Sequence, residues 1–311
     1  MVQFLGIISV LILVVLPSYL LIRLSRKKNT NPIGFIIQWV LVAVLVLFFY
    51  QGASWPFAVG YYTRYLMLGM LILCSSVILF RYKRITKTRA TWKNYLFSVL
   101  NILVILILIN GMWMIKKGKH PSEKKIELAF PLRGERYYVA HGGSTEIINH
   151  HFAVPSQKFA LDICKLTPIG LRAHSLFPKD LSSYAIFGQN LYSPCSGTII
   201  EVADQYPDQR PPLSDPEHPF GNFLAIRTLG GNAVIVLAHL QKGSLQKQVG
   251  DQIQKGELVA KVGNSGNTSE PHLHIHAVDG SSTDYLYDGE GISITFDGAF
   301  YVRNDLINKS H

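Results

Sequence analysis

Four long apolar runs fill the first 115 residues, and they constrain the fold more than any other feature of the sequence. A helix needs roughly 20 mainly apolar residues to cross the ~30 Å hydrocarbon core of a bilayer. The third run is the shortest and can be extended by Tyr61 and Tyr62. No Asp, Glu or His lies in the runs, which argues against a proton relay or an ion pathway. Residues 1–115 are therefore predicted to form a four-span transmembrane anchor whose partner is the lipid bilayer. The expected spans are Phe4–Ile22, Ile33–Tyr50, Tyr65–Phe80 and Tyr95–Ile115.

The basic residues between these runs indicate the orientation of the anchor. Four cations follow the first run, within Arg23–Lys28, and six lie in the loop Arg81–Lys93. The loop Gln51–Arg64 carries a single cation. A cleavable signal peptide has its positive charges before the apolar run, so the first run is expected to remain as a span. The positive-inside rule then places both basic loops in the cytoplasm and everything after Ile115 outside it.

The distribution of charge excludes one class of function. The net charge of +10 on 311 residues would suit a nucleic-acid partner, but residues 1–115 hold 11 cations and no acidic residue. The remaining 19 cations are matched by all 20 acidic residues, so residues 116–311 are close to neutral. All 11 histidines lie at or after His120. We therefore expect no nucleic-acid partner, and we expect the chemistry in the second part of the chain.

Residues 116–128 are predicted to be a charged linker, and residues 129–311 an all-β, mainly antiparallel domain. Short β-type segments recur there between Gly, Pro, Asn and Asp, and long patterns with the helical period of 3.6 are absent from the sequence. The loop 204–219, rich in Asp and Pro, is expected to edge a groove. For Cys164 and Cys195, a disulfide and two separate buried thiols are both open. Expected strands include Phe159–Cys164, Gly197–Val202, Asn222–Thr228, Ala233–Ala238, Leu258–Val262, Leu273–Val278 and Phe300–Val302.

An alternation of histidines follows a turn-forming stretch near residue 270. Side chains repeat every second residue along a strand, so His272, His274 and His276 are expected to share one face. Same-face neighbours lie roughly 6–7 Å apart, so one imidazole can hold a metal ion while the next reaches a water molecule beside it. Two histidines in this pattern would favour an exposed polar face on an edge strand. Three in alternation, directly after the glycine-containing loop 263–268, favour a metal-dependent hydrolytic site.

Two further residues interrupt apolar strands. Asp162 lies inside Phe159–Cys164, and a carboxylate there is costly to bury unless it is paired or binds a metal. His239 follows the apolar segment Val234–Ala238. A single histidine in that position is more often a hydrogen-bonded structural residue, so His239 is a candidate only in combination with the others.

Several of these motifs together resemble the M23 (lysostaphin/LytM-like) zinc metallopeptidases. The most specific element is Pro271-His272-Leu273-His274 after Gly263-Asn264-Ser265-Gly266-Asn267-Thr268. Ala238-His239-Leu240 is similar to the histidine strand of that family, and Ser193–Ile199 to the strand that enters its groove. The resemblance covers about residues 130–278. It implies a small antiparallel β-fold, one zinc ion (Zn²⁺) per chain and hydrolysis of peptide bonds in bacterial peptidoglycan.

The resemblance also assigns roles to residues and places the protein in the bacterial cell membrane. It makes His274 and Asp162 zinc ligands, while His239 and His272 flank the activated water and the scissile carbonyl as catalytic residues. A zinc ion with three protein ligands keeps an open position and lowers the pKa of a bound water towards ~7. Either flanking histidine can then accept a proton or stabilise the oxyanion.

One position departs from the family pattern. The family usually has a histidine ligand four residues before the aspartate, where this chain has Lys158, and an ammonium group cannot replace an imidazole at neutral pH. Asn149-His150-His151, followed by Gln157–Asp162, resembles an M23 subgroup in which the second histidine supplies the ligand. His151 is therefore the predicted metal ligand, with His150, His141 and no ligand at all as the alternatives.

Two other functions remain open at this point. The first is a non-catalytic M23-like domain that binds cell-wall peptides or regulates another hydrolase, which Lys158 favours. The second is a biotinyl or lipoyl carrier, because Gly250–Gly256 resembles a carrier hairpin, but no acceptor lysine element of that kind is present. The His-Glu-x-x-His and Gly-x-Ser-x-Gly signatures of other hydrolases are also absent from the sequence.

Overall fold

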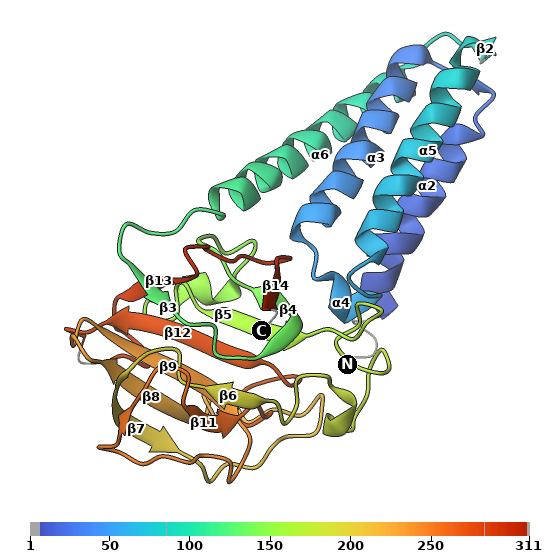
Figure 1. Ribbon diagram of the computed structural model, residues 1–311. Coiled ribbons are helices and arrows are strands. Elements are labelled where there is room, and N and C mark those ends of the chain that lie inside the picture. Colours follow the sequence, from blue (N-terminus) through green and yellow to red (C-terminus); the bar gives the residue numbers. More distant parts are fainter. Residues whose placement is uncertain (1–6, 85, 283, 310–311) are drawn as a thin grey trace. The chain divides into compact units, whose positions relative to one another are not determined.

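The computed structural model describes residues 7–84, 86–282 and 284–309 (Figure 1). The contacts divide the chain into two compact units, Met1–Ile115 and Lys116–His311, which we name the helical unit and the β-rich unit. The fold class predicted from the sequence is confirmed: apolar helices come first and a mainly antiparallel β-domain follows.

Four helices of the helical unit are long and apolar enough to cross a membrane, namely Ile7–Ser25, Pro32–Gly52, Thr63–Arg84 and Trp92–Lys117. The third begins two residues before the predicted span, and the predicted start at Phe4 lies outside the described residues. Only 11–22% of the residues in each span are buried, because most of their apolar side chains face outward. The elements are η1 (Leu11–Val15), α2 (Leu16–Ser25), β1 (Asn29–Thr30), α3 (Pro32–Gly52), α4 (Trp55–Ala58), α5 (Thr63–Arg81), η2 (Tyr82–Arg84), β2 (Thr86–Lys87) and α6 (Trp92–Lys117).

Local sequence signals explain where these helices begin and how their loops are held. The Asn31 side chain accepts a hydrogen bond from Gly34 N at 2.9 Å and caps α3, whose first residue is Pro32. The two basic loops are joined by a short parallel pairing of β1 with β2, in which Asn29 lies opposite Thr86. A core that includes Phe35, Val46 and Trp55 packs α2, α3 and α5 together.

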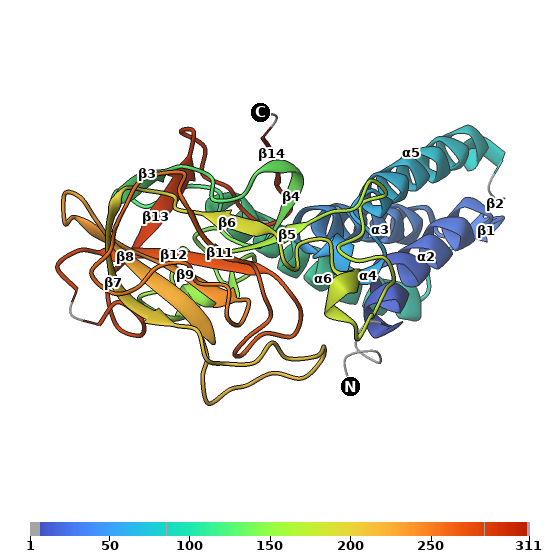
Figure 2. The same ribbon diagram turned by 60° about the horizontal axis from the view of Figure 1, so that its bottom comes forward.

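The β-rich unit is built on one large sheet with the strand order β10-β7-β8-β9-β12-β5-β4-β14 (Figure 2). β13 pairs with β12 and, in parallel, with β3, while β6 and β11 form a separate pair. The bounds are β3 (Lys125–Leu128), β4 (Gly134–His141), η3 (His150–Ala153), β5 (Leu161–Lys165), η4 (Leu181–Ser183), β6 (Asn190–Tyr192), β7 (Gly197–Ala203), β8 (Asn222–Thr228), β9 (Ala233–Leu240), β10 (Gln252–Ile253), β11 (Leu258–Lys261), β12 (Leu273–Asp279), β13 (Gly291–Phe296) and β14 (Leu306–Lys309).

The centre of this sheet is buried on both faces. Every residue of β9 is buried, and its side chains alternate between two apolar clusters on opposite sides. Ile235 and Leu237 belong to the larger cluster, whereas Val234 and Val236 pack with Phe220 in the smaller one. β12 lies between this buried strand and β5, which matters because β12 and β5 carry candidate site residues.

Three details differ from the sequence prediction or decide between its alternatives. Residues 300–302 form no strand, because Asp305 N donates to Val302 O at 3.0 Å and closes a turn there. Part of the predicted linker, Lys125–Leu128, forms the strand β3, because Ser293–Phe296 of β13 pairs with it in parallel. Cys164 and Cys195 are both free thiols, so the disulfide alternative is not adopted.

Candidate metal centre

Two adjacent strands bring Asp162 and His274 together. Asp162 of β5 lies directly opposite His274 of β12 in the antiparallel register. Such cross-strand neighbours have Cβ atoms about 4.5–5.5 Å apart, close enough for their side chains to meet. His274 Nδ1 lies 3.0 Å from Asp162 Oδ1, and the two residues are only 2% and 5% exposed. The carboxylate that interrupts an apolar strand thus faces an imidazole.

The third imidazole comes from the short helical turn η3. Asn149 caps this turn, because its side-chain oxygen accepts a hydrogen bond from His151 N. Its amide group donates to the carbonyls of Gly143, Lys158 and Ala160, and the residue is fully buried. Asn149 therefore fixes the turn against the segment that enters β5.

The ligand atoms of His151, Asp162 and His274 all lie within 4.8 Å of one another, a spacing that suits one metal ion. His151 Nε2 lies 2.9 Å from Asp162 Oδ2, the carboxylate oxygen that His274 does not contact. These are the three residues predicted from the sequence as ligands. Two imidazoles and one carboxylate form a donor set that zinc accepts, with positions left open for water or substrate.

The protons of the buried imidazoles can be assigned from their hydrogen-bond partners. The Tyr285 carbonyl can only accept, so His276 Nε2, at 3.2 Å, carries a proton and donates to it. His276 Nδ1 is then an acceptor and receives the proton of His274 Nε2 at 3.0 Å. The lone pair of His274 Nδ1 is left facing the Asp162 carboxylate. Two acceptors in contact need a cation between them, which is the strongest sign of a metal site in the structure.

His239 and His272 flank this group. His239 Nδ1 donates to Ser265 O at 2.8 Å, and His272 Nδ1 donates to Glu270 O at 2.9 Å. Nε2 is therefore the nitrogen of each ring that is left to exchange a proton, and His272 Nε2 lies 3.5 Å from Asp162 Oδ1. Burial lowers the pKa of His272, but the Asp162 carboxylate outweighs it and raises this pKa. The two ring centroids are 4.8 Å apart. The catalytic residues predicted from the sequence thus form a pair beside the three candidate ligands.

Burial and the single carboxylate determine the charges of these groups. Burial lowers the pKa of His274 to about 3 and that of His276 to about 4, so both rings are neutral at pH 7. Burial raises the pKa of Asp162, but the neighbouring His151 and His272 outweigh it and hold this pKa well below its usual range. Asp162 is therefore an ionised carboxylate, and an anion beside the neutral His274 ring is a pair that can bind a metal ion.

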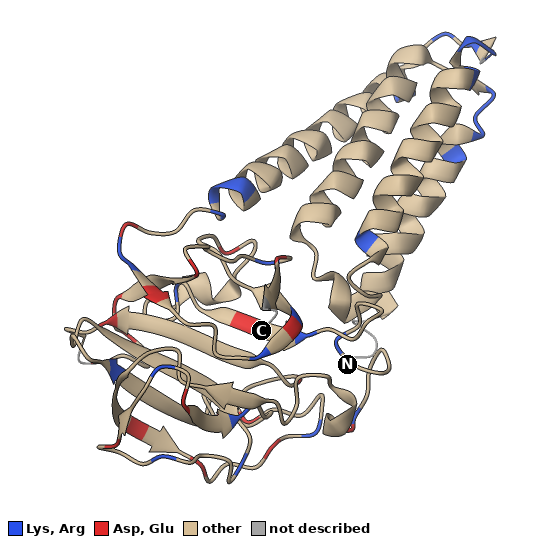
Figure 3. Ribbon diagram, viewed as in Figure 1, with Lys and Arg blue, Asp and Glu red and all other residues tan. Residues whose placement is uncertain are grey.

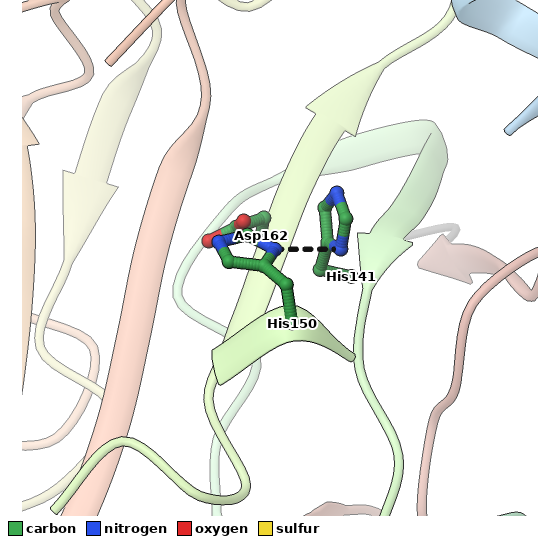
Figure 4. Close-up of side chains that lie close together, drawn as sticks. All are labelled: His141, His150 and Asp162. Atoms are coloured by element: carbon green, nitrogen blue, oxygen red, sulfur yellow. Dashed lines mark hydrogen bonds between the residues drawn. The ribbon is translucent and has the colours of Figure 1, made fainter. Parts of the chain in front are cut away.

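A second group shares the same carboxylate (Figure 4). Ligand atoms of His141, His150 and Asp162 also lie within 4.8 Å of one another. His141 Nδ1 is 2.9 Å from His150 Nδ1 and 2.6 Å from Arg303 Nη2. A guanidinium group can only donate, so it occupies the lone pair of His141 Nδ1 and places a positive charge next to any cation there. This contact makes the second group the poorer metal site.

Lys158 takes no part in either group. Its ammonium nitrogen lies 4.9 Å from the ring centroid of Phe152 and 5.9 Å from that of Phe159. The side chain also lines a surface cavity with Glu290 and Gly291 rather than the metal group. Its replacement of the usual histidine therefore leaves the ligand position to η3.

The loop 263–268 carries Ser265, whose main-chain oxygen accepts the hydrogen bond from His239. The loop is held in place by the close approach of Gly266 to Gly221. A Cβ atom on Gly266 would lie 2.4 Å from Gly221 N, and Gly266 has φ +86°, so a side chain there would force the loop away. The backbone of this loop is also held by Asp208, which accepts from Asn264 N at 2.6 Å. Asp208 belongs to the predicted groove-edging loop 204–219.

Several supporting residues were not predicted from the sequence. The buried carboxylate of Glu270, whose main-chain oxygen holds His272, pairs with the buried guanidinium of Arg172. Tyr285 and Ser265 act through main-chain carbonyls, which carry no signature in a sequence. Arg172 and Glu270 lie about a hundred residues apart in the sequence, so no local pattern could predict that they pair. Among the supporting residues, His276 alone was indicated by the sequence, through the alternation of histidines.

Comparison with known proteins finds a family match within the β-rich unit. Residues 181–284 match peptidase family M23, a stretch that contains His239, His272 and His274 but not His151 or Asp162. No curated protein matches the chain. Solved structures similar to it include lysostaphin (18% identity, 42% of this chain and 40% of that one, TM-score 0.27). Others are a putative peptidase M23 from Pseudomonas aeruginosa (16%, 54% and 50%, 0.30) and a zinc-containing peptidase from Vibrio cholerae (18%, 40% and 50%, 0.24). The chain thus spans half or less of the length of these three proteins.

Proposed function

The chain carries a domain of peptidase family M23, and from this premise we propose that it is a membrane-anchored, extracytoplasmic zinc endopeptidase acting on peptidoglycan peptides. The observation that supports this most is the opposition of two acceptors, the His274 Nδ1 lone pair and the Asp162 carboxylate. We assign one zinc ion to His151, Asp162 and His274. When bound, it supplies Lewis acidity toward a water molecule and an amide carbonyl.

The flanking histidines then perform the proton chemistry. His239 and His272 each have Nδ1 fixed as a donor to a main-chain carbonyl, which leaves Nε2 to exchange a proton. An unprotonated Nε2 can accept a proton from water, and a protonated ring can stabilise the oxyanion or protonate the leaving amine. Their fixed Nδ1 donors keep both rings in one tautomer, so no reorientation is needed during the reaction.

Zinc content and peptidoglycan digestion of the full-length protein, purified in mild detergent, test this function together. We expect about one zinc per chain by elemental analysis and release of peptide fragments from purified peptidoglycan. His274→Ala and His151→Ala should lose both, whereas His239→Ala should lose digestion and keep the metal. Full digestion by His274→Ala, or an unmutated protein that binds no zinc, would contradict the proposal.

A second candidate function is a non-catalytic domain that binds cell-wall peptides. The presence of Lys158 where the family usually has a histidine favours it. This reading requires that the protein sediment with peptidoglycan without cutting it, and that His239→Ala bind as well as the unmutated protein. Digestion that depends on His239 excludes it.

We further propose that the β-rich unit lies outside the cytoplasm, because both basic loops, Arg23–Lys28 and Arg81–Lys93, are expected to stay inside. A cysteine placed in each compartment tests this in a variant that lacks the native cysteines. Ser281→Cys, exposed in the β-rich unit, should react with a membrane-impermeant maleimide on whole cells. Thr88→Cys, exposed between α5 and α6, should react only after the membrane is opened. The reverse pattern would place the peptidase site in the cytoplasm.

A further inference from the structure

The helical unit contains a cavity of about 420 Å³ between α2, α3 and α6. Its walls are apolar over one part, where leucine, valine and phenylalanine side chains line it. Four polar side chains line the rest, namely Arg23, Lys27, Gln38 and Asn101. They come from three different helices and the loop after α2, so residues distant in the sequence converge on one space.

All four polar side chains offer hydrogen-bond donors. Arg and Lys can only donate, and the amides of Gln38 and Asn101 each carry an NH₂ group. Lys27 Nζ already donates to the Gln38 side-chain oxygen at 3.2 Å, which leaves the amide hydrogens of Gln38 for another acceptor. The ligand that matches such a lining is an oxyanion.

The charge of the cavity is uncompensated within this unit. Arg23 of α2 and Lys27 of the loop after it line the same cavity, and their like charges repel each other. Burial and the charge of Arg23 lower the pKa of Lys27. Residues 1–115 contain no Asp or Glu, and Figure 3 shows none on the described part of the unit. An anion from outside the unit would relieve this repulsion.

A positive-inside signal alone does not explain this arrangement. Arg26 and Lys28 belong to the same basic loop, are exposed and do not line the cavity, whereas Arg23, although also exposed, and the half-buried Lys27 both line it. Such exposed cations are sufficient to set orientation. Gln38 and Asn101 lie within predicted spans, where a polar side chain is costly unless it has a partner.

We propose that this cavity binds one anionic phospholipid of the cytoplasmic leaflet, with the phosphodiester group held by Arg23 and Lys27 and an acyl chain along the apolar wall. This inference rests on the proposed membrane insertion and orientation, but not on peptidase activity. The combination of cations, amide donors and an apolar wall matches both ends of a lipid. Basic pockets between transmembrane helices on this side of a membrane are suited to lipid headgroups.

Native mass spectrometry of the full-length protein in detergent tests the inference with two double variants of equal charge. After exchange into phosphatidylglycerol, we expect about one lipid per chain on the unmutated protein and on Arg26→Gln/Lys28→Gln. The amount of phosphatidylglycerol bound to Arg23→Gln/Lys27→Gln should be lower by roughly tenfold or more, which is the loss expected when two phosphate contacts are removed. Equal losses in both double variants would overturn the site, because surface charge alone would then explain binding.

Three further measurements of lipid binding distinguish this site from its alternatives. Phosphatidylcholine should be retained at least several-fold less than phosphatidylglycerol, and equal retention would overturn the anion site. Release of the lipid by millimolar inorganic phosphate would assign the site to free phosphate instead. Gln38→Leu/Asn101→Leu, which changes no charge and so leaves orientation intact, should also lower retention, and unchanged retention would contradict the role of the amides. Lipid counting needs no hydrolysis, so failure of the peptidase proposal would leave this result readable.

Discussion

Two pairs of histidines share the carboxylate of Asp162, and they differ in what their other contacts allow. In the inner pair, His151 and His274 each face one carboxylate oxygen, and the second nitrogen of His274 is supported by His276. In the outer pair, His141 and His150 face each other, and a guanidinium group lies on His141 Nδ1. The residue types are the same, so the partner of each ring nitrogen decides which pair can hold a cation.

The largest expected effect removes what both pairs share. Asp162→Asn keeps the size of the side chain and removes its charge, so neither pair retains an anion for a cation. We expect loss of bound zinc and a decrease in peptidoglycan hydrolysis of roughly three orders of magnitude or more, because several kcal/mol of stabilisation are lost. Elemental analysis and digestion rates measure the two effects. Glu135→Gln, an exposed carboxylate on β4 outside both groups, is the control and should keep its zinc.

A comparison of adjacent histidines separates the inner from the outer pair. His151→Ala should weaken zinc binding by more than about 100-fold, beyond the 10–100-fold typical of a lost supporting contact. His150→Ala, the same change one residue earlier, should weaken it by less than about tenfold. Competition with a fluorescent chelator gives both constants. If His150→Ala proves the more damaging, the outer pair holds the metal and our assignment of His151 is wrong.

Removing the support of the inner pair should have a smaller effect. His276→Phe keeps a planar ring but takes away the acceptor for the His274 Nε2 proton, so His274 can adopt the wrong tautomer. We expect zinc affinity to fall about 10–100-fold, with hydrolysis at saturating zinc largely recovered. An unchanged zinc affinity would show that the tautomer of His274 does not depend on His276.

The smallest expected effect concerns acid stability without metal. Burial lowers the pKa of His141 to about 3 and that of His150 to about 4, below the ordinary histidine value of 6.5. The unfolded chain then binds more protons than the folded one below pH 6.5, so stability falls as the pH decreases toward about 4. Thermal unfolding in chelator should show this decline.

A double variant tests whether the outer pair contributes to that decline. His141→Asn/His150→Asn should have a shallower dependence of melting temperature on pH between 6.5 and 4. His120→Asn, an exposed histidine in the same unit, is the control and should keep the original slope. Equal slopes in all three proteins would mean that the outer pair is protonated equally in the folded and unfolded states.

Much of the centre followed from local pattern, and the rest depended on contacts across the fold. The alternation His272-Leu273-His274 and the carboxylate within β5 identified two of the candidate ligands, because strand periodicity and burial cost act locally. The choice of His151 over its neighbour depends on the Asn149 cap and on Arg303, which lies more than 150 residues further along the chain. The local pattern Asn149-His150-His151 favoured His151 only through the family resemblance, and nothing in it indicates the contact with Arg303.

Errors in the fold prediction have a similar origin. Residues 300–302 have β-type composition, but a turn closed by Asp305 takes their hydrogen-bonding groups out of any ladder. Conversely, Lys125–Leu128 has the composition of a tether and becomes a strand because β13 offers it a free edge. In both segments, the partner rather than the propensity decides the conformation.

The hydrogen-bonded series from His274 through His276 to Tyr285 O also has an electrical direction. Both imidazoles donate toward the Tyr285 carbonyl, so their dipoles are aligned and the electron-rich end of the series points at the candidate metal position. Two neutral side chains therefore add negative potential at that position without adding a second anion. A cation held by a single carboxylate gains stabilisation in this way, while the site keeps a net charge that remains attractive to the oxygen of a peptide carbonyl.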